Sequence, residues 1–510
     1  MSISPDFDAF AARYDSGTPQ VVSTKLVADL ETPVSAYLKL ADGRANSFLL
    51  ESVEGGSVRG RYSIIGFKPD VVWRCRKGQA EINRRAQTDS QAFEALEGRP
   101  LETLRVLIKE CQMDLPPGLP PMASGLFGFL GYDMVRDMER LPDTNPDPIG
   151  LPDAIMVRPT MICIFDRLED NATLVTPVWP QAGTSARAAY EAAQERLADA
   201  VSDFERTLPF RRDSAEGLDA LPKPQANMSK EDFKAMVETC KEYIRAGDAF
   251  QIVPSQRFSL PFKLPPLSLY RSLRRINPSP FLIFFDYGDF TIVGSSPEIL
   301  VRLRDNTVTI RPLAGTRRRG ATPEEDKRLA EELLADPKER AEHLMLVDLA
   351  RNDVGRVSKI GSVRVVEQFT IEKYSHVQHI SSHVEGTLEE GLDAIDVLKA
   401  GFPAGTLSGA PKVRAMQIID EVEPVRRGIY AGCAGYFAAN GTMDTCILLR
   451  TALVKDETMY VQAGVGVVAD SDLEAEYQES VQKALGLVRA AEEAVRFASA
   501  GQWTAGNTRR

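Results

Sequence analysis

Strand-forming and helix-forming segments follow one another along this chain without regular alternation, and this order limits the fold more than any other feature. Strand-like runs are expected at residues 47–52, 63–66, 71–73 and 446–453, bounded by turn residues. A well-marked helix is expected at 337–350. A doubly wound parallel sheet needs strict strand–helix alternation, so the pattern favours an α+β fold.

A polar, proline-bearing segment divides the sequence. We expect an N-terminal region at residues 21–205, a linker at 206–228 and a C-terminal region at 229–495. A chain of 510 residues has room for about three average domains, or for one large composite domain.

Charge and composition argue against several classes of protein. The net charge of −11 disfavours nucleic acid or an anionic membrane as the main partner. No apolar run approaches the ~20 residues of a membrane span, and the first residues do not resemble a signal peptide. The six cysteines are scattered without a CxxC pair, which is typical of reduced thiols. We therefore expect a cytoplasmic protein.

Two pairs of glutamates, Glu339 with Glu342 and Glu476 with Glu479, have i,i+3 spacing. This spacing places both members of a pair on one face of a helix. Burying such carboxylates is costly unless a cation or protons neutralise them, and all-oxygen ligands favour Mg²⁺ over zinc. The plain alternative for either pair is a solvated helix face.

The helices that carry these pairs have recognisable N-termini in the sequence. Asp336 can cap the first helix, with Pro337 in its first turn and Glu339 at the third position. Ser471 with Glu474 predicts a similar capping box for the last helix.

Three loops rich in small residues are candidate binding segments. Residues 460–468 predict a strand that runs into a Gly-x-Gly turn, where free N–H groups can bind an anion. The motif is not the GxGxxG of a dinucleotide site, and residues 402–412 are not a P-loop. The third loop, 311–320, carries arginines. Taken alone, each loop also has an ordinary interpretation as a turn or solvated surface.

Six motifs in sequence order resemble the chorismate-utilising enzymes, most specifically the large subunits (component I) of anthranilate synthases. The motifs are Gly-Ser-Ser-Pro-Glu at 294–298, Arg-Pro-Leu-Ala-Gly-Thr at 311–316, Ala-Glu-His-Leu-Met-Leu-Val-Asp-Leu-Ala-Arg-Asn-Asp at 341–353, Phe-Pro-Ala-Gly-Thr-Leu-Ser-Gly-Ala-Pro-Lys at 402–412, Ala-Gly-Val-Gly-Val at 463–467 and Glu-x-x-Glu at 476–479. The resemblance covers nearly the whole chain. It implies an α+β fold of two antiparallel β-sheets packed face to face and flanked by helices.

The resemblance implies a Mg²⁺ ion between the ring carboxylate of chorismate and the glutamate pairs. The matching ligands are Glu342 and Glu479, with Glu339 and Glu476 holding the waters around the ion. The metal would offset like charges that otherwise repel a dianionic substrate.

The resemblance also implies a set of substrate-binding positions. Arg450 would hold the enolpyruvyl carboxylate beside Tyr430, and Lys483 would pair with the other carboxylate. Successive backbone N–H groups in the Gly-x-Gly turn would bind a carboxylate. The matching positions are Gly315, Thr316, Tyr430, Arg450, Gly464, Val465, Gly466 and Lys483.

The catalytic positions follow from the same resemblance. Glu298 matches the general acid that protonates the departing C4 hydroxyl. His379 and Thr406 match positions linked to the second step, elimination of pyruvate from the aminated intermediate. Gln251 stands where isochorismate and salicylate synthases have a water-activating lysine. Ala314 stands where some aminodeoxychorismate synthases have a covalent lysine, so both substitutions favour amination by ammonia.

A feedback site for tryptophan is implied in the N-terminal part and near residue 280. Its expected contacts are Glu51, Ser52, Pro280, Phe281 and Leu282. Phe281 departs mildly from the commoner tyrosine of this site. From their residues alone, the segment with Glu51 and Ser52 would be interpreted as the end of a strand, and the segment with Pro280 as a proline turn.

The activity implied is that of an oxo-acid lyase that makes anthranilate from chorismate, the first step of tryptophan biosynthesis. No Cys/His/Glu triad of a glutaminase is recognisable, so glutamine-dependent activity implies a separate amidotransferase small subunit that donates ammonia. Two alternatives remain open: the large component of an aminodeoxychorismate synthase in the folate pathway, and a non-catalytic sensor of chorismate or an aromatic amino acid.

Overall fold

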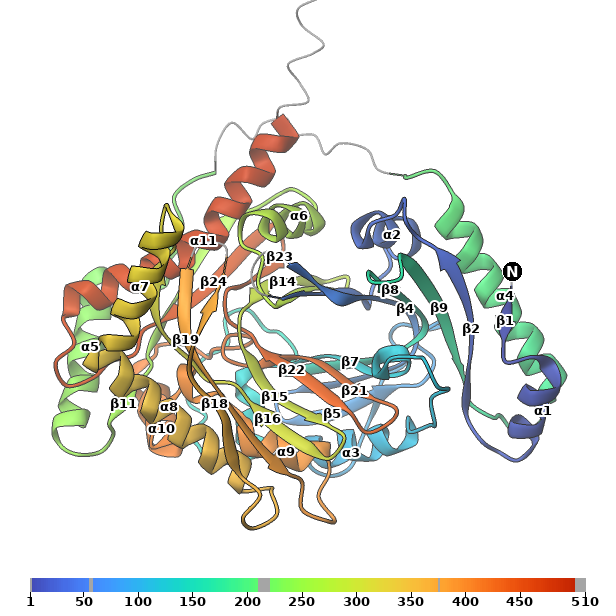
Figure 1. The fold of residues 1–510 in the computed structure, drawn as a ribbon, viewed down its shortest axis with the longest axis horizontal. Helices are drawn as coiled ribbons and strands as arrows, with labels where there is room; N and C mark the ends of the chain where they lie inside the picture. The colour runs from blue at the N-terminus through green and yellow to red at the C-terminus, as the bar shows by residue number, and fades with distance from the viewer. Residues whose placement is uncertain (1, 55–57, 210–220, 375–376, 500–510) are drawn as a thin grey trace, which may run out of the picture.

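Helices surround a large antiparallel sheet in this protein, whose computed structural model describes residues 2–54, 58–209, 221–374 and 377–499 (Figure 1). The helices are α1 (Phe7–Asp15), α2 (Pro33–Leu40), α3 (Pro100–Glu110), α4 (Ala186–Glu205), α5 (Lys230–Arg245), α6 (Pro266–Ile276), α7 (Pro323–Ala335), α8 (Pro337–Gly355), α9 (Ala394–Gly401), α10 (Lys412–Val422) and α11 (Leu473–Ser499), with 3-10 turns η1 (Pro121–Ala123), η2 (Tyr132–Asp137) and η3 (Gly405–Leu407). Part of the predicted linker, 210–220, lies outside the described residues.

The strands fall into one extended sheet and one small pair. They are β1 (Ile3–Ser4), β2 (Gln20–Val27), β3 (Ser47–Glu54), β4 (Val58–Arg76), β5 (Gln79–Asn83), β6 (Glu94–Ala95), β7 (Gly125–Leu130), β8 (Ala154–Asp166), β9 (Asn171–Val178), β10 (Gln225–Ala226), β11 (Gln251–Ile252), β12 (Ser255–Pro261), β13 (Phe281–Asp286), β14 (Phe290–Ser296), β15 (Ile299–Arg304), β16 (Thr307–Ile310), β17 (Leu313–Arg318), β18 (Arg364–Lys373), β19 (Val377–Thr387), β20 (Gly409–Ala410), β21 (Cys433–Ala438), β22 (Met443–Ile447), β23 (Thr451–Lys455) and β24 (Thr458–Gly464). Strands β11 and β20 pair with each other apart from the rest.

Strands from the two ends of the sequence alternate within the sheet. Strand β3 pairs with β13, placing Leu50 opposite Ile283, and β7 pairs with β21, placing Gly128 opposite Gly435. These ladders are antiparallel, which confirms the predicted α+β class. The predicted division into two regions at 206–228 stays a prediction. The ladders pair strands from both sides of it within one sheet.

Aromatic side chains fill the space between two facing layers of strands. Phe48 of β3 stacks on Phe127 of β7 with ring centroids 4.7 Å apart, and Phe127 lies 5.6 Å from Tyr436 of β21. Strand β3 pairs with β4 and β13, whereas β7 pairs with β8 and β21, so the Phe48–Phe127 stack joins two layers, while Phe127 and Tyr436 lie opposite each other on paired strands. The layers pack face to face as predicted, but they belong to one continuous sheet joined through the β4–β8 ladder and not to two separate sheets.

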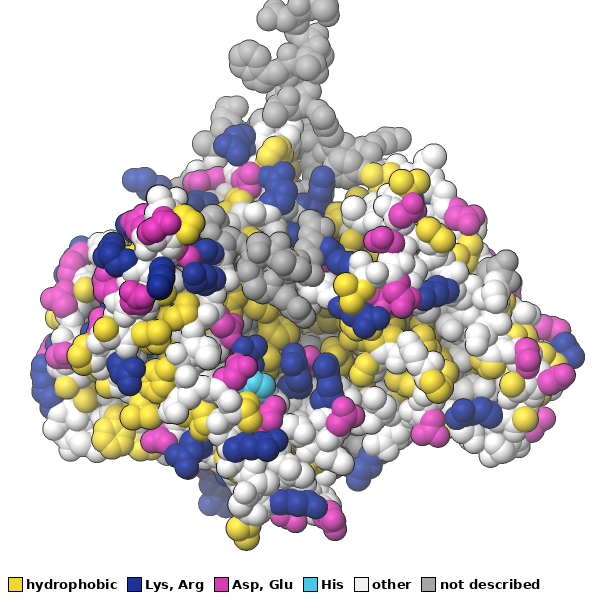
Figure 2. Space-filling model, in the orientation of Figure 1, with side chains coloured by type: hydrophobic (Ala, Val, Ile, Leu, Met, Phe, Trp, Pro, Cys, Tyr) yellow, Lys and Arg dark blue, Asp and Glu magenta, His cyan; other side chains and the backbone are white. Residues whose placement is uncertain are grey.

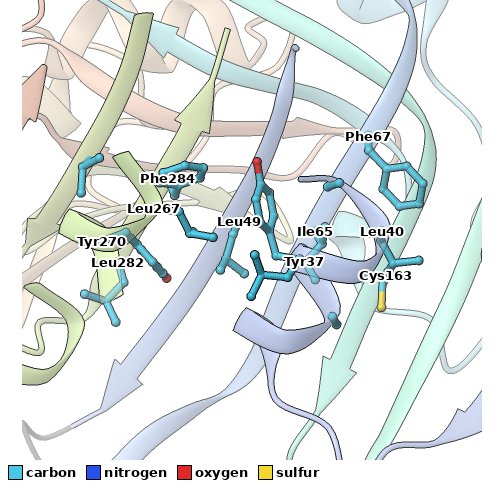
Figure 3. Close-up of a cluster of buried hydrophobic side chains, with 14 of the residues drawn as sticks. Tyr37, Leu40, Leu49, Ile65, Phe67, Cys163, Leu267, Tyr270, Leu282 and Phe284 are labelled. Atoms are coloured by element: carbon cyan, nitrogen blue, oxygen red, sulfur yellow. The ribbon is translucent and has the colours of Figure 1, made fainter. Parts of the chain in front are cut away.

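A second apolar cluster packs helices α2 and α6 against the outer face of the layer that contains β3 and β13 (Figure 3). Tyr37 and Leu40 of α2 and Tyr270 of α6 pack with Leu49 of β3 and Phe284 of β13. Burying each such side chain is worth roughly 1.5–3 kcal/mol, so the helices and strands stabilise one another. Within the described residues, no helix combines the length and apolarity that crossing a membrane requires. All six cysteines are buried free thiols.

The predicted cap of α8 is confirmed. The Asp336 carboxylate accepts hydrogen bonds from the backbone N–H groups of Lys338 at 3.0 Å and Glu339 at 3.4 Å, and Pro337 opens the helix. The cap fixes where the helix begins and therefore which face carries Glu339 and Glu342.

The predicted capping box of the last helix is wrong by one residue. Asp472 accepts from the N–H groups of Glu474 and Ala475 at 3.1 and 2.9 Å. Ser471 is buried and its hydroxyl accepts from the Val468 N–H at 3.0 Å, which closes the preceding turn. Both residues are good caps, and the position of the turn decides between them.

Candidate active site

Glu298 lies in the short link between β14 and β15, where its surroundings favour the protonated acid. Desolvation raises its pKa to about 7, against the opposing effects of a hydrogen bond from Thr406 and the charges of Arg450 and Lys483. The Thr406 hydroxyl, from η3, donates to Glu298 Oε2 at 3.0 Å. The side chain can therefore donate a proton near neutral pH, as a general acid must.

His379 of β19 is a neutral imidazole with one free nitrogen. Its Nδ1 lies 2.9 Å from the Gly315 carbonyl oxygen and 3.1 Å from the Thr316 hydroxyl. A carbonyl only accepts, so Nδ1 carries the proton and Nε2 holds a lone pair. Nε2 is buried and meets no hydrogen-bond partner among the described residues. Burial lowers the pKa of His379 to about 4, so the ring is uncharged at neutral pH.

Gly315 sits where a side chain would not fit. Its φ is +66°, and an added Cβ would come within 2.9 Å of Glu339 Oε2 and 3.0 Å of Leu333 Cδ1. The glycine thus allows β17 to approach the glutamate face of α8.

Arg450 is half-buried, and its guanidinium meets no hydrogen-bond or ion-pair partner among the described residues. Its backbone is in the left-handed region, with φ of 49°, a conformation that costs energy in a non-glycine residue. Burial lowers the pKa of its guanidinium, which still stays charged. Tyr430 lies beside the Gly464 N–H, which is directed at its hydroxyl. An unpaired arginine held in this way is well suited to binding a carboxylate.

Both glutamate pairs reach the same region. Burial raises the pKa of Glu342, and the charges of Glu339 and Glu479 raise it further. Burial also raises the pKa of Glu476, with Glu479 adding to the effect. The start of α8 and the start of α11 therefore lie close enough for their carboxylates to repel one another, as the sequence predicts.

These carboxylates suit a Mg²⁺ ion that is bound by few protein ligands. Glu339 pairs with Arg317 at 3.0 Å and Glu479 with Lys483 at 2.7 Å, whereas Glu342 has only a 3.4 Å contact with the Gln251 amide. In the described parts of the chain no three acidic, histidine or cysteine side chains are already clustered as a metal cage. Mg²⁺ usually takes one or two carboxylates and completes its sphere with water and substrate oxygens, so the donor set fits.

The Gly-x-Gly turn offers fewer N–H groups than expected. The N–H of Val465 donates to the Pro254 carbonyl at 3.1 Å, so it is not available to a ligand. The Gly464 N–H faces Tyr430, and Lys483 donates to the Gly464 carbonyl at 3.0 Å. Only the N–H of Gly466 in this turn meets no hydrogen-bond partner among the described residues. The expected row of three amides is thus corrected to one, because the turn is bonded to the segment before β12.

Two contacts of this site were missed from the sequence. Arg317 neutralises Glu339, and Tyr374 lies edge-on to His379 with ring centroids 5.4 Å apart. Arg317 belongs to the arginine-bearing loop that the sequence singles out, but nothing there shows which acid it meets. Tyr374 carries no spacing signal at all.

A cavity of about 1000 Å³ lies between the layers, apart from the glutamates. All five residues expected to contact tryptophan line it: Glu51, Ser52, Pro280, Phe281 and Leu282. Across the cavity are Arg302, Arg304 and Arg311. Figure 2 shows hydrophobic side chains (yellow) together with Lys and Arg (dark blue) near the middle of this face.

Glu51 does not direct its carboxylate into this cavity. Its oxygens bind Arg274 in a bidentate ion pair, Arg167 at 3.0 Å and the Tyr270 hydroxyl at 2.7 Å. Successive side chains of a strand point to opposite faces, so Leu50 and Ser52 share one face of β3 and Glu51 faces α6. Only the backbone of Glu51 is left to meet a ligand in the cavity.

Comparison with known proteins identifies a consistent group of relatives. The family of chorismate binding enzymes matches residues 48–489. Anthranilate synthase component 1 of Cereibacter sphaeroides is 59% identical over 492 residues, covering 96% of this chain and 98% of that protein. The same component of Pseudomonas aeruginosa is 47% identical over 475 residues, covering 92% and 94%.

Solved structures agree with these sequence relatives. Anthranilate synthase component I from Streptococcus pneumoniae superimposes with a TM-score of 0.73 at 37% identity, covering 91% of this chain and 99% of that one. A menaquinone-specific isochorismate synthase from Escherichia coli gives a TM-score of 0.70 at 19% identity, which shows a shared fold alone.

Proposed function

The chain belongs to the family of chorismate binding enzymes, and from this premise we propose that it is the large, chorismate-aminating subunit of an anthranilate synthase. The reaction replaces the C4 hydroxyl of chorismate by an amino group at C2 and then eliminates pyruvate to leave anthranilate. The observation that carries the proposal is one site that combines Glu298, whose pKa burial raises to about 7, a neutral His379 and an Arg450 guanidinium that meets no partner in the described parts of the chain.

Glu298 serves the first step. The lone pair of ammonia forms a bond to C2, both ring double bonds shift by one position, and the C4–oxygen bond breaks; the ammonium group formed at C2 then loses a proton to solvent. Glu298 donates its proton to the departing hydroxyl, which leaves as water. The resulting carboxylate keeps the hydrogen bond from Thr406, which stabilises its new charge. Ammonia is itself a nucleophile, so Gln251 in place of a basic residue is consistent with this step.

His379 serves the second step. Its Nε2 lone pair accepts the proton from C2, the C–H electrons form the third double bond that makes the ring aromatic, and the bond from C3 to the enolpyruvyl oxygen breaks. The leaving group is the enolate of pyruvate, which takes up a proton from solvent to give pyruvate. The hydrogen bond from Nδ1 to the Gly315 carbonyl fixes the tautomer that leaves Nε2 free.

Charge complementarity positions the dianionic substrate. Arg450 binds the enolpyruvyl carboxylate beside Tyr430, and Lys483 supplies a second positive charge near the Gly466 N–H. A Mg²⁺ ion held by Glu342 and Glu479, with Glu339 and Glu476 around its waters, would neutralise the glutamates and bind the ring carboxylate. The position of Glu342 supports this assignment, because its carboxylate is largely desolvated, which raises its pKa, and it lies within reach of the charges of Glu339 and Glu479.

The wider assignment includes a regulator, a partner and a location. The cavity lined by Ser52, Pro280, Phe281 and Leu282 is the proposed site for tryptophan as feedback inhibitor. A separate glutamine amidotransferase subunit would supply ammonia from glutamine. The enzyme would act in the cytoplasm.

One assay separates this function from its alternatives. The purified chain is incubated with chorismate, Mg²⁺ and an ammonium salt, and fluorescent anthranilate and pyruvate are measured. Formation of both supports the proposal. A product that becomes aromatic only when a lyase is added indicates an aminodeoxychorismate synthase. Binding of chorismate without turnover indicates a sensor.

A further inference from the structure

A buried ion pair lies directly behind the candidate site. Arg427, which follows α10, donates from Nε to Glu423 Oε2 at 3.0 Å and from Nη2 to Oε1 at 2.6 Å. Their side chains are 1% and 3% exposed. The reaction steps above use neither residue.

Arg427 also joins two active-site segments that are distant in sequence. Its Nη1 donates to the Leu407 carbonyl at 2.7 Å, and its Nη2 donates to the Val253 carbonyl at 2.6 Å. Leu407 follows Thr406, the residue that hydrogen-bonds Glu298. Val253 precedes Pro254, whose carbonyl accepts from the N–H of Val465. One guanidinium therefore holds the Thr406 loop and the segment that fixes the Gly-x-Gly turn.

Glu423 extends the connection to the sheet. Its Oε1 accepts from the backbone N–H of Ser255 at 2.8 Å and from the Ser255 hydroxyl at 2.7 Å. Ser255 lies opposite Gly464 in the β12–β24 ladder. The guanidinium of Arg427 lies 5.6 Å from the ring centre of Tyr430, so the pair also touches the tyrosine beside the turn.

Stability alone does not explain such a pair. Removing two charges from water costs about as much as their attraction returns, and well-packed apolar residues often replace a buried pair without loss. A guanidinium, however, can bind two carbonyls and a carboxylate at fixed angles, which an apolar side chain cannot do.

We propose that the Arg427–Glu423 pair is a positioning device for the reaction, resting on the proposed function: it holds Thr406 against Glu298 and the Gly-x-Gly turn with Tyr430 against the substrate. Neither residue touches the reacting atoms. Their effect on rate comes from the geometry of the groups that do, and misplacement by about 1 Å can cost 10²-fold in rate.

The test is the double variant Arg427→Met with Glu423→Leu, which removes both charges and leaves apolar bulk. We expect its melting temperature to fall moderately, because the Leu407 and Val253 carbonyls and the Ser255 N–H lose buried partners, while Arg427→Met alone, which also leaves a buried carboxylate unpaired, lowers it further. We expect kcat of the double variant to fall by roughly 10²-fold with a smaller change in KM.

The pH profile distinguishes positioning from general loosening. The hydrogen bond from Thr406 lowers the pKa of Glu298, so a displaced Thr406 loop should move the alkaline limb of kcat/KM to higher pH. Thr406→Val should cause the same shift, and combining it with the double variant should add little. The matched control is Arg158→Met with Asp70→Leu, a distant pair joined at 2.8 and 2.7 Å, which should leave kcat and the profile unchanged.

Defined outcomes would overturn the proposal. A folded double variant with normal kcat and an unshifted pH profile would show that the pair has no positioning role. If that variant does not fold, Arg427→Lys replaces it, because lysine keeps the charge but cannot reach both carbonyls. Normal kinetics in a folded Arg427→Lys would count equally against the proposal. If the unchanged chain makes no anthranilate, the proposed function fails instead.

Discussion

Glu298 shows how far surroundings change the chemistry of a residue. An exposed glutamate is ionised at neutral pH, but here desolvation raises its pKa to about 7. The protonated acid is the active form. We therefore expect kcat/KM, which reports the free enzyme, to be highest on the acid side of neutrality and to fall as pH rises through about 7.

Replacing the acid tests this assignment. Glu298→Gln keeps the shape but cannot donate a proton, so we expect kcat to fall by roughly 10²–10⁴-fold with little change in melting temperature. The alkaline limb near the pKa of Glu298 should disappear with it. Steady-state kinetics from acid to alkaline pH with ammonia held constant as the free base provide the measurement. A variant that keeps its kcat would remove Glu298 from the mechanism.

Gly315 is a second residue whose role depends on its neighbours. Gly315→Ala adds a methyl group within 2.9 Å of Glu339 Oε2, in a backbone conformation that alanine tolerates poorly. We expect at least a tenfold loss of kcat/KM and a higher Mg²⁺ requirement, because Glu339 must move. Gly361→Ala is the matched control, since its φ is +78° but nothing lies within 4 Å of the added atom. Equal losses in both variants would indicate backbone strain alone.

At the scale of elements, the start of α11 decides where Glu476 and Glu479 point. Asp472→Ala removes the acceptor for two N–H groups and should cost about 1 kcal/mol of unfolding free energy, which Asp472→Asn should largely restore. Urea unfolding measures both. Asp470→Ala, at an exposed position in the preceding turn, is the control and should cost little. A cost at Asp470 but not at Asp472 would contradict the cap.

Strands were harder to predict than helix starts. Residues 63–66 and 71–73 belong to one strand, β4, which continues through an irregularity at Pro69, opposite Pro159 of β8. The expected strand at 446–453 is instead two strands, β22 and β23, and Arg450 lies in the break. Apolar runs show which residues are buried, but not where a ladder begins or ends.

At the scale of the whole molecule, the layers enclose the proposed tryptophan cavity. Tryptophan should raise the melting temperature, because a ligand that binds the folded state at 100 times its Kd adds about 2.7 kcal/mol. It should also lower ammonia-dependent anthranilate formation.

The cavity wall provides the corresponding variant. Phe281→Ala should need at least a tenfold higher tryptophan concentration for the same rise in melting temperature. Ammonia-dependent kcat should be retained, because Phe281 lines the cavity and not the active site. Phe497→Ala, at a 48% exposed position on α11, is the control and should keep the full response. An unchanged response in Phe281→Ala would place the inhibitor elsewhere.

The sequence by itself determined what depends on near neighbours along the chain. Helical periodicity placed Glu339 with Glu342, and Glu476 with Glu479, on shared faces, and Asp336 marked the start of α8. These features follow from local geometry and residue chemistry, so they are visible without a fold. The resemblance to a known family, and not spacing or geometry, identified Glu298 and His379.

Only the tertiary structure decided what depends on segments that are distant in sequence. It bonded the N–H of Val465 to Pro254, turned Glu51 toward Arg274 and joined Arg427 to two active-site loops, and it left the Arg450 guanidinium without a partner within the described residues. Each outcome depends on which group arrives from elsewhere in the chain to satisfy a donor or a charge. The packing of distant segments decides which group this is, and the spacing of residues along the sequence does not show it.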